Sequence, residues 1–404
     1  MNQLLTNQKF YITIFVIYLL ILLLSASANI PYVDSYYYWL WSTHLQLSYF
    51  DGPPMIAYAI RLATTVFGNS VFAINLVGIV VALLTTWVVA NITNLILGHN
   101  KYGFLVGLIW FTDYAITAHR IINFVTYDGL ENLFSLLAIM FTIRYIQLRQ
   151  NYDLYFIGLN AGLALLSKYS AIIFIVAIIS YFIYSKELRG VFKQIHVYLA
   201  MLITTIISSP ILVWNYQNKW ISFWFQLTYH PYSQPRTLAT VSYFVYYYLF
   251  KTLISSILPI IVILLIVKYY NRGGNKFKLL SEVDNRQVLG LLFTILAFIF
   301  GFWLLVSGVV RIPDRYMLVF ESILIILMGI ILLSHKFYKL FLFFIIYNLA
   351  FSIGDIISHC LVIRNPTCYE FYIKSKKISF NSPLQKYIKV QPGASDFCYT
   401  EMRH

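Results

Sequence analysis

Apolar residues form long runs along this 404-residue chain, and short polar breaks separate them. Several runs reach about 18 residues or more, the length that a helix needs to cross the hydrocarbon core of a bilayer. The runs lie near residues 10–28, 71–97, 102–118, 123–147, 154–167, 170–185, 196–214, 240–267, 288–307, 317–334 and 338–357. The pattern predicts an all-α integral membrane protein, a polytopic bundle of about 11 transmembrane helices.

Basic residues gather in every second break between the runs, which fixes the expected orientation. These cations are Arg144 and Arg149, then Lys186, Arg189 and Lys193, then Lys268, Arg272, Lys276, Lys278 and Arg286, then Lys336 and Lys339. By the positive-inside rule these breaks and the N-terminus are cytoplasmic, and the loops between them lie outside. The formal net charge of +14 therefore reflects membrane topology, and we expect no nucleic-acid partner.

Two parts make up the predicted organisation. Residues 1–363 form a transmembrane domain, with an uncleaved first helix and a long first outer loop at 29–70. Residues 364–404 form a short basic extracytoplasmic tail that could lie on anionic lipid head groups. Cys368 and Cys398 in the tail either form a disulfide in an oxidising compartment or remain separate thiols.

The first outer loop carries two acidic residues among many aromatic ones. No Lys or Arg stands between Lys9 and Arg61, so neither Asp34 nor Asp51 has a basic neighbour in sequence. Residues 34–49 predict a helix lying in the membrane interface, and the stretch from Asp51 to Pro54 predicts a turn into the next helix. Asp34 is either a helix N-cap or a catalytic group, and Asp51 is either a turn residue or an ion ligand.

Five segments in order resemble the GT-C polyprenyl-phosphate-sugar glycosyltransferases. The resemblance is to their bacterial branch, which includes protein O-mannosyltransferases and lipid A aminoarabinose transferases. The segments are "DSYYYWLWSTHLQLSYFDGPPMI" (34–56), "TYDGLENLF" (126–134), "GLALLSKYSAIIF" (162–174), "SPILVWNYQNKWISFWFQ" (209–226) and "RIPDRYMLVFESILII" (311–326). They extend over about three quarters of the chain. The resemblance implies a GT-C fold with interfacial helices in the first outer loop.

The resemblance also implies a reaction and its residues. A GT-C enzyme moves a sugar, with inversion, from a polyprenyl-phosphate donor to an extracytoplasmic acceptor, which is lipid A or lipopolysaccharide, a surface glycan or a protein hydroxyl. Asp34 is the expected base and Asp128 a second carboxylate; alternatively, Asp128 is an N-cap. The expected phosphate-binding residues are Lys168, Arg236, Arg311, Arg315 and Tyr316, although a cation at a membrane rim is more often a snorkelling anchor. The expected substrate pocket comprises Tyr37, Tyr49, Asp51, Trp214 and Asn215.

This sequence departs from the family pattern in three places. Gly52 replaces a His or Lys, Ser35 replaces the second acid of the opening pair, and Tyr127 replaces a Pro. No Asp-x-Asp element occurs, so we expect no obligatory metal cofactor. A divalent ion held by Asp51 and His230 is the alternative, since a carboxylate and an imidazole suit zinc.

Two other functions remain open at the level of the sequence. A transporter or flippase for lipid-linked sugars would also need many spans, but its ionisable groups usually lie near the bilayer midplane. A family member that binds the lipid carrier without catalysis is the second alternative, because Gly52 and Ser35 depart from the pattern. We expect the protein in the bacterial inner membrane with its active site on the extracytoplasmic face, in contact with membrane lipids, the donor and a lipid or glycan acceptor.

Overall fold

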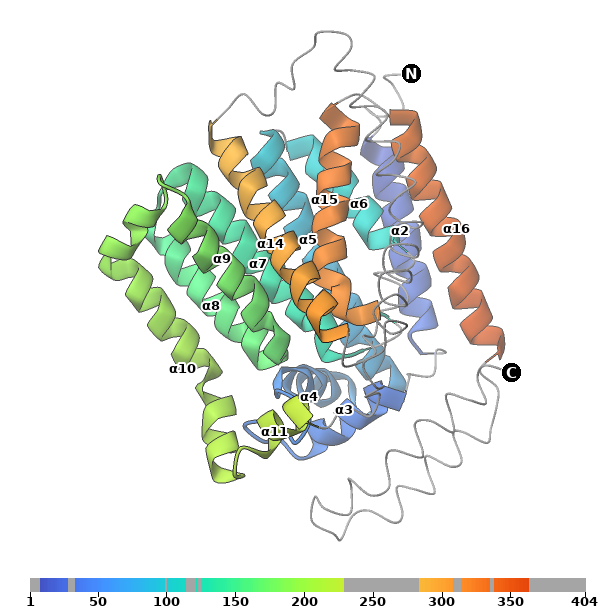
Figure 1. Ribbon diagram of the computed structural model, residues 1–404. Helices are drawn as coiled ribbons and strands as arrows, with labels where there is room; N and C mark the ends of the chain where they lie inside the picture. The colour runs from blue at the N-terminus through green and yellow to red at the C-terminus, as the bar shows by residue number, and fades with distance from the viewer. Residues whose placement is uncertain are drawn as a thin grey trace.

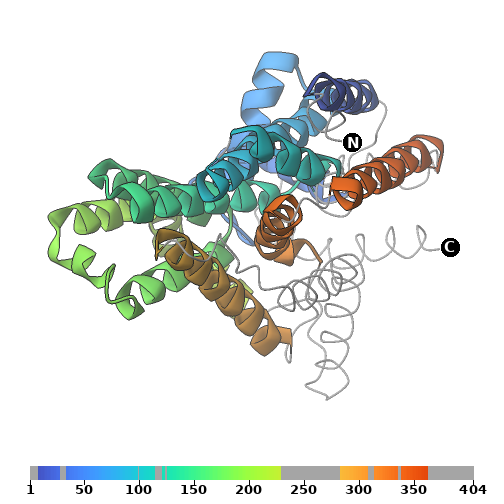
Figure 2. The same cartoon turned by 90° about the horizontal axis from the view of Figure 1, so that it is seen from above.

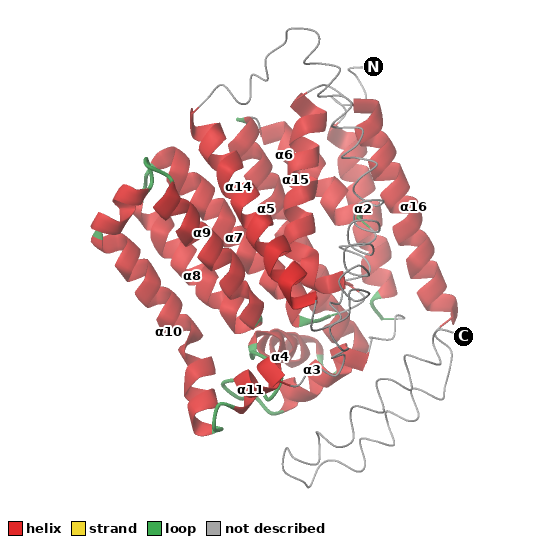
Figure 3. Cartoon of the chain, viewed as in Figure 1, coloured by secondary structure: helices red, strands yellow, loops and turns green. Residues whose placement is uncertain are grey.

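The computed structural model describes residues 8–27, 33–98, 100–113, 121–122, 125–228, 283–307, 314–334 and 338–362. Within these ranges all regular secondary structure is helical (Figure 3). Four of the described helices are long and apolar enough to cross a membrane, at Val71–Leu97, Tyr127–Leu148, Ile195–Gln217 and Arg286–Val306. The prediction of an all-α polytopic membrane fold is therefore confirmed in its class.

Most predicted spans correspond to a helix of the bundle (Figure 1). The helices are α2 (Gln8–Ser25), α5 (Val71–Leu97), α6 (Asn100–Thr112), α7 (Tyr127–Leu148), α8 (Asn151–Ser167), α9 (Ile172–Tyr184), α10 (Ile195–Gln217), α14 (Val283–Ser307), α15 (Leu318–Ser334) and α16 (Tyr338–Val362). The predicted span at 240–267 and the tail from 364 lie outside the described residues. The total of about 11 spans stays a prediction.

Short helices cover one end of this bundle. Helices α3 (Val33–Thr43) and α4 (Met55–Phe67) lie across that end, and α11 (Ile221–Thr228) lies beside them (Figure 1). The same end holds the junction of α8 with the short 3-10 helix η2 (Tyr169–Ala171). Segments that the charge pattern assigned to the outer face are thus gathered at one end of the molecule.

The first of these short helices ends earlier than the sequence predicted. The predicted helix at 34–49 was too long, because α3 ends at Thr43. Beyond it the phenol of Tyr49 donates hydrogen bonds to the carbonyls of Trp41 (2.9 Å) and His44 (3.2 Å). The Tyr49 ring also stacks on Trp41 with centroids 4.1 Å apart. These contacts fold the chain back, whereas a continuing helix would carry Tyr49 away from Trp41.

Helix α3 is fixed against the start of α7, far along the sequence. The backbone N–H of Val125 donates to the hydroxyl of Ser35 at 3.1 Å, and Ser35 is fully buried. The rings of Tyr38 and Tyr127 meet edge to face with centroids 5.3 Å apart. The serine that replaces a family acid therefore ties α3 to the segment before α7, which brings the acids of both elements to one region.

Small residues let α8 and α10 pack closely. A side chain at Gly158 would lie 2.3 Å from the carbonyl oxygen of Ala200, and one at Gly162 would lie 2.7 Å from Ile207. Glycines spaced four apart commonly allow such close helix packing within membranes. The hydroxyl of Thr204 donates to the Gly158 carbonyl at 2.9 Å across the same contact.

Candidate active site

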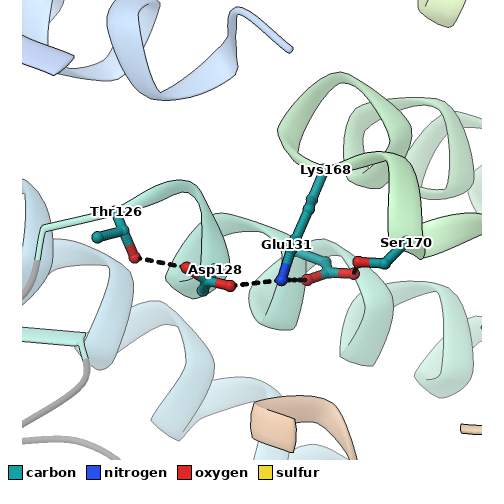
Figure 4. A network of polar contacts seen from close by, with 5 residues as sticks. All are labelled: Thr126, Asp128, Glu131, Lys168 and Ser170. Carbon is teal, nitrogen blue, oxygen red and sulfur yellow. Dashed lines mark hydrogen bonds and ion pairs between the residues drawn. The ribbon is translucent and has the colours of Figure 1, made fainter. Parts of the chain in front are cut away.

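A buried lysine forms the centre of the candidate site. Helix α8 ends at Ser167, and Lys168 follows in an extended conformation before η2 begins. Its side chain points back against α7, where Nζ lies 2.6 Å from Oδ1 of Asp128 and 3.7 Å from Oε2 of Glu131 (Figure 4). Only 7% of Lys168 is exposed. A charge buried to this degree must be paired, and two carboxylates provide that pairing.

The two carboxylates are held by hydroxyl groups as well as by the lysine. The Thr126 hydroxyl donates to Asp128 at 2.9 Å, and the Ser170 hydroxyl donates to Glu131 at 2.7 Å (Figure 4). The N-cap position of α7 belongs to Thr126, so the alternative reading of Asp128 as the N-cap is wrong. Asp128 instead uses both oxygens in this buried network.

Sequence reasoning missed Glu131, although a signal was present. Residues three apart on a helix lie on the same face. The side chains of Asp128 and Glu131 must therefore point in the same direction. A pair of acids on one face of an apolar helix needs a cation in the fold. Lys168 meets that need from another helix.

Aromatic rings enclose the remaining side of the lysine. Nζ of Lys168 lies 3.4 Å from the ring centroid of Tyr316, which belongs to the 3-10 helix η6 (Asp314–Met317). The rings of Tyr127 and Trp303 lie at 5.6 and 5.9 Å. These are cation–π distances. The sequence placed Tyr316 near Lys168 by resemblance, but it gave no signal for Trp303, because a Trp at the end of a span usually marks the membrane interface.

The second group of acids lies in the first outer loop, around Asp51. The phenol of Tyr37 donates to Oδ1 of Asp51 at 3.1 Å. The pKa of the Asp51 carboxyl is raised from 3.8 to about 7, chiefly by burial and to a smaller extent by the nearby charge of Asp34, although the hydrogen bond from Tyr37 lowers it. Asp34 is half-buried in the first turn of α3. The fold therefore brings the two acids of the opening loop within electrostatic range of each other.

Tyr127 connects the two groups. Its ring centroid lies 5.6 Å from Nζ of Lys168 and 5.3 Å from the ring of Tyr38 in α3. A side chain at Gly52, next to Asp51, would lie 3.8 Å from this ring. The ring of Tyr127 consequently lies between the lysine cluster and the first loop that carries the two acids.

The α10–α11 segment also contacts the first loop. The indole N–H of Trp214 donates to Oε1 of Gln46 at 2.8 Å, and the Gln226 amide donates to the carbonyl of Asp51 at 2.6 Å. Asn215 is fully buried and donates to the Ile211 carbonyl within α10. Of the predicted pocket residues, Trp214 thus contacts the loop, Asn215 follows Trp214 in α10, and Tyr49 packs within the loop. Whether they touch substrate stays a prediction.

Several predicted residues lie beyond what the structure describes. Arg236, Arg311 and His230 are outside the described residues, and for Arg315 only the backbone, within η6, is described. Within the described ranges no group of three or more His, Cys, Asp or Glu side chains could hold a metal ion. The pairing of Asp51 with His230 stays untested, and so does the expectation of no obligatory metal.

Comparisons of sequence identify relatives for the middle of the chain. Residues 51–214 match the family described as dolichyl-phosphate-mannose-protein mannosyltransferase. The chain is 28% identical over 202 residues to the lipid A galacturonosyltransferase RgtD of Rhizobium johnstonii. The aligned residues make up 49% of this chain and 41% of RgtD. The family match includes Asp51, Asp128, Lys168 and Trp214. It does not reach Asp34 or the segment at 311–326.

Comparison of structures extends the likeness to most of the chain. ArnT from Cupriavidus metallidurans superposes with a TM-score of 0.60 in its apo state, at 14% identity, and in its complex with undecaprenyl phosphate, at 16% identity. The superposition covers 81% and 80% of this chain and 60% of ArnT in both cases. This chain matches less than two thirds of the length of these relatives. The middle of the chain therefore matches this mannosyltransferase family in sequence, and most of the chain has a fold like that of ArnT. Both comparisons agree with the resemblance to the GT-C glycosyltransferases.

Proposed function

We propose that this protein transfers a sugar from a polyprenyl-phosphate donor to an acceptor on the extracytoplasmic side of the bacterial inner membrane. The observation that carries the proposal is the position of Lys168. This buried lysine, held by Asp128 and Glu131, lies beside the loop that brings Asp34 and Asp51 together. Cation and carboxylates thus meet at the end of the bundle that α3 and α4 cover.

The proposed reaction assigns a task to each charge. An acceptor hydroxyl attacks the anomeric carbon while the bond from that carbon to the phosphate oxygen breaks, with inversion. A carboxylate takes the hydroxyl proton, and cations stabilise the polyprenyl phosphate as it leaves. Asp34 is the proposed base, by resemblance. Asp51 is its neighbour, and a pKa of about 7 suits proton transfer near neutral pH.

The carboxylates around Lys168 offset its positive charge, which limits its ability to bind the donor phosphate alone. Lys168 contacts two carboxylates, so its single positive charge is already matched within the cluster. A donor phosphate there requires further cations. The ring of Tyr316 rests on Lys168, which places the backbone of Arg315 next to the cluster. We therefore propose that Arg315, with Arg311 and Arg236, supplies the positive charge that binds the phosphate. Lys168 and Asp128 would then orient the bound donor.

Three classes of acceptor fit the proposed reaction. The curated relative is named for lipid A and the matching family for protein acceptors. Lipid A or lipopolysaccharide, a surface glycan and a protein hydroxyl all present the attacking hydroxyl that the reaction needs. Comparative mass spectrometry of surface lipids, glycans and proteins from cells with and without the gene identifies the added sugar and its acceptor together.

Reconstituted protein tests the transfer directly. In proteoliposomes with a polyprenyl-phosphate sugar and an extract of surface lipids as acceptor, we expect wild-type protein to form a sugar-bearing product. Asp34→Asn should lower the rate by 100-fold or more, as expected for loss of a general base. Glu187→Gln, in the α9–α10 loop at the other end of the bundle, is the matched control and should retain the rate.

The transporter alternative predicts a different result in the same vesicles. Donor would then cross the bilayer without any new glycosidic bond, and Asp34→Asn would leave this movement unchanged. Full transfer activity in Asp34→Asn, with transfer lost in Asp51→Asn, would instead move the base to the second acid of the loop.

A further inference from the structure

An apolar groove is lined by residues of three neighbouring helices, α8, α9 and α10. Helix α8 forms its floor, and α9 and α10 form its walls. The lining includes Leu154, Ala161, Ile178, Phe182 and Val197. Its empty volume is about 580 Å³. Helix α10 stands at the edge of the bundle (Figure 2), so the groove opens between helices that border the lipid.

The chemistry of the lining suits a hydrocarbon chain. Thr204 is the one hydroxyl-bearing residue of the lining, and its hydroxyl donates to the carbonyls of Gly158 and Ala200. It therefore leaves no unsatisfied donor toward the groove. A polar ligand would find no hydrogen-bond partner on these walls, whereas an acyl chain needs none.

Basic residues stand where the groove reaches the α9–α10 loop. Phe192 belongs to the groove and to the short helix η3 (Arg189–Lys193), which starts with one cation and ends with another. Both cations are exposed. The acid of this loop, Glu187, accepts a hydrogen bond from Gln287 of α14. Positive charge therefore predominates beside Phe192.

A polar pair lies near this end of the groove, outside its lining. The phenol of Tyr155 and Nδ1 of His196 lie 2.5 Å apart, and each residue directly follows or precedes a lining residue, Leu154 or Val197. Tyrosine and histidine at such a position have an apolar body and a polar tip, as is usual at the level of lipid head groups. The groove thus passes from a purely apolar part to a polar, basic end.

We propose that this groove binds one acyl chain of an anionic glycerophospholipid, whose head group is held by Arg189 and Lys193. The occupant comes from the leaflet at the α9–α10 end, which by its charge is the cytoplasmic one. Lys168 lies at the other end of α8, so this lipid is separate from the donor bound at the candidate active site. Its role is to fill the space between α9 and α10.

Native mass spectrometry of the delipidated full-length protein tests the site. The protein is titrated with phosphatidylglycerol or with phosphatidylcholine that has the same acyl chains. We expect one phosphatidylglycerol to bind about tenfold more tightly than phosphatidylcholine, since each cation near a membrane surface favours anionic lipid severalfold. The double substitution Arg189→Gln and Lys193→Gln should abolish this preference.

Two pairs of variants separate the acyl groove from the charge. Ile179→Trp fills the groove and should lower binding of both lipids, whereas Val176→Trp, exposed on the same helix and outside the lining, should not. Lys219→Gln, an exposed cation at the opposite end of α10, should keep the preference for phosphatidylglycerol. Thermal unfolding of each variant checks that the fold is intact.

Two outcomes would overturn the proposal. One is equal binding of both lipids that the charge substitutions do not alter. The other is displacement of phosphatidylglycerol, one for one, by polyprenyl phosphate, because that result would assign the groove to the carrier lipid.

Discussion

Lys168 is the residue on which the candidate site depends most. A single lysine satisfies two buried carboxylates from α7 and contacts the ring of Tyr316. Removing one partner of a buried ion pair leaves uncompensated charge, which costs more than the pair itself contributes. The lysine is therefore a structural residue as well as a candidate for catalysis.

Substitution Lys168→Met should reduce the free energy of unfolding by about 3–5 kcal/mol. Thermal and denaturant unfolding in detergent measures the change. Arg61→Met, at an exposed position of α4, should change it by less than about 0.5 kcal/mol. Adding Asp128→Asn to Lys168→Met should recover part of the loss, because one buried charge is removed. A destabilisation below about 1 kcal/mol would mean that the cluster does not hold the bundle together.

Asp51 should make both stability and activity depend on pH. Its pKa is raised in the folded protein from 3.8 to about 7. A raised pKa means that the folded state binds the proton more tightly, so the added stability is complete below about pH 4 and is lost as pH rises through 7. We expect the free energy of unfolding to fall by roughly 2 kcal/mol over this interval, since solvent reduces the effect at a half-buried group.

The test compares wild type with Asp51→Asn between pH 4 and pH 8. The asparagine should remove this part of the pH dependence. Tyr37→Phe removes a hydrogen bond that lowers the pKa, so it should move the midpoint above 7. A pH profile identical in wild type and Asp51→Asn would refute the assignment.

Among the elements, α8 positions both the candidate active site and the apolar groove. Its last turn leads to Lys168, and its glycines bring α10 close. Helix α10 in turn contains Pro210 and continues to Trp214, which donates to the first loop. Packing between these two helices is therefore coupled to the position of the loop that carries Asp51.

Gly158→Ala should destabilise the protein by about 1–3 kcal/mol, because the new methyl group would meet the backbone of Ala200 and force the helices apart. Unfolding in detergent reports this loss. Gly301→Ala in α14 is the matched control, since no atom lies within 4 Å of the added carbon. It should be neutral or slightly stabilising, given the helix preference of alanine. Equal effects of the two substitutions would contradict close α8–α10 packing.

At the scale of the whole molecule, the candidate active site and the basic α9–α10 loop lie at opposite ends of the bundle. The short helices α3, α4 and α11 lie at one end (Figure 1). Lys168 belongs to this end, because it lies beside the ring of Tyr127, which meets Tyr38 of α3. The basic loop that joins α9 and α10 lies at the other. By the positive-inside rule we expect the basic end to be cytoplasmic and the candidate active site to lie outside.

Labelling of introduced cysteines tests this orientation. In a background that lacks the three native cysteines, an impermeant thiol reagent added to spheroplasts should label Lys219→Cys in the α10–α11 turn. It should label Lys193→Cys only after the membrane is opened. Both positions are exposed in the structure. The opposite pattern would invert the topology and place the lysine cluster in the cytoplasm.

Much of the helical framework follows from the sequence, because a long apolar run in a membrane has few alternatives to a helix. The bounds of α5, α7 and α15 lie within a few residues of the predicted spans. The helix at 34–49 was predicted too long, since its end depends on the contact of Tyr49 with Trp41, which no periodicity reveals.

The sequence by itself determined the class of fold, the family resemblance and the residues Lys168, Asp128 and Asp51 as candidates. Only the tertiary structure decided how they are paired. The spacing of Asp128 and Glu131 puts both acids on one face of a helix, but the sequence could not reveal that Lys168, forty positions after Asp128, pairs with them, or that Trp303 completes the cluster. The reason is physical: helix formation in a membrane is a local property of the chain, whereas the pairing of buried charges depends on which helices pack together.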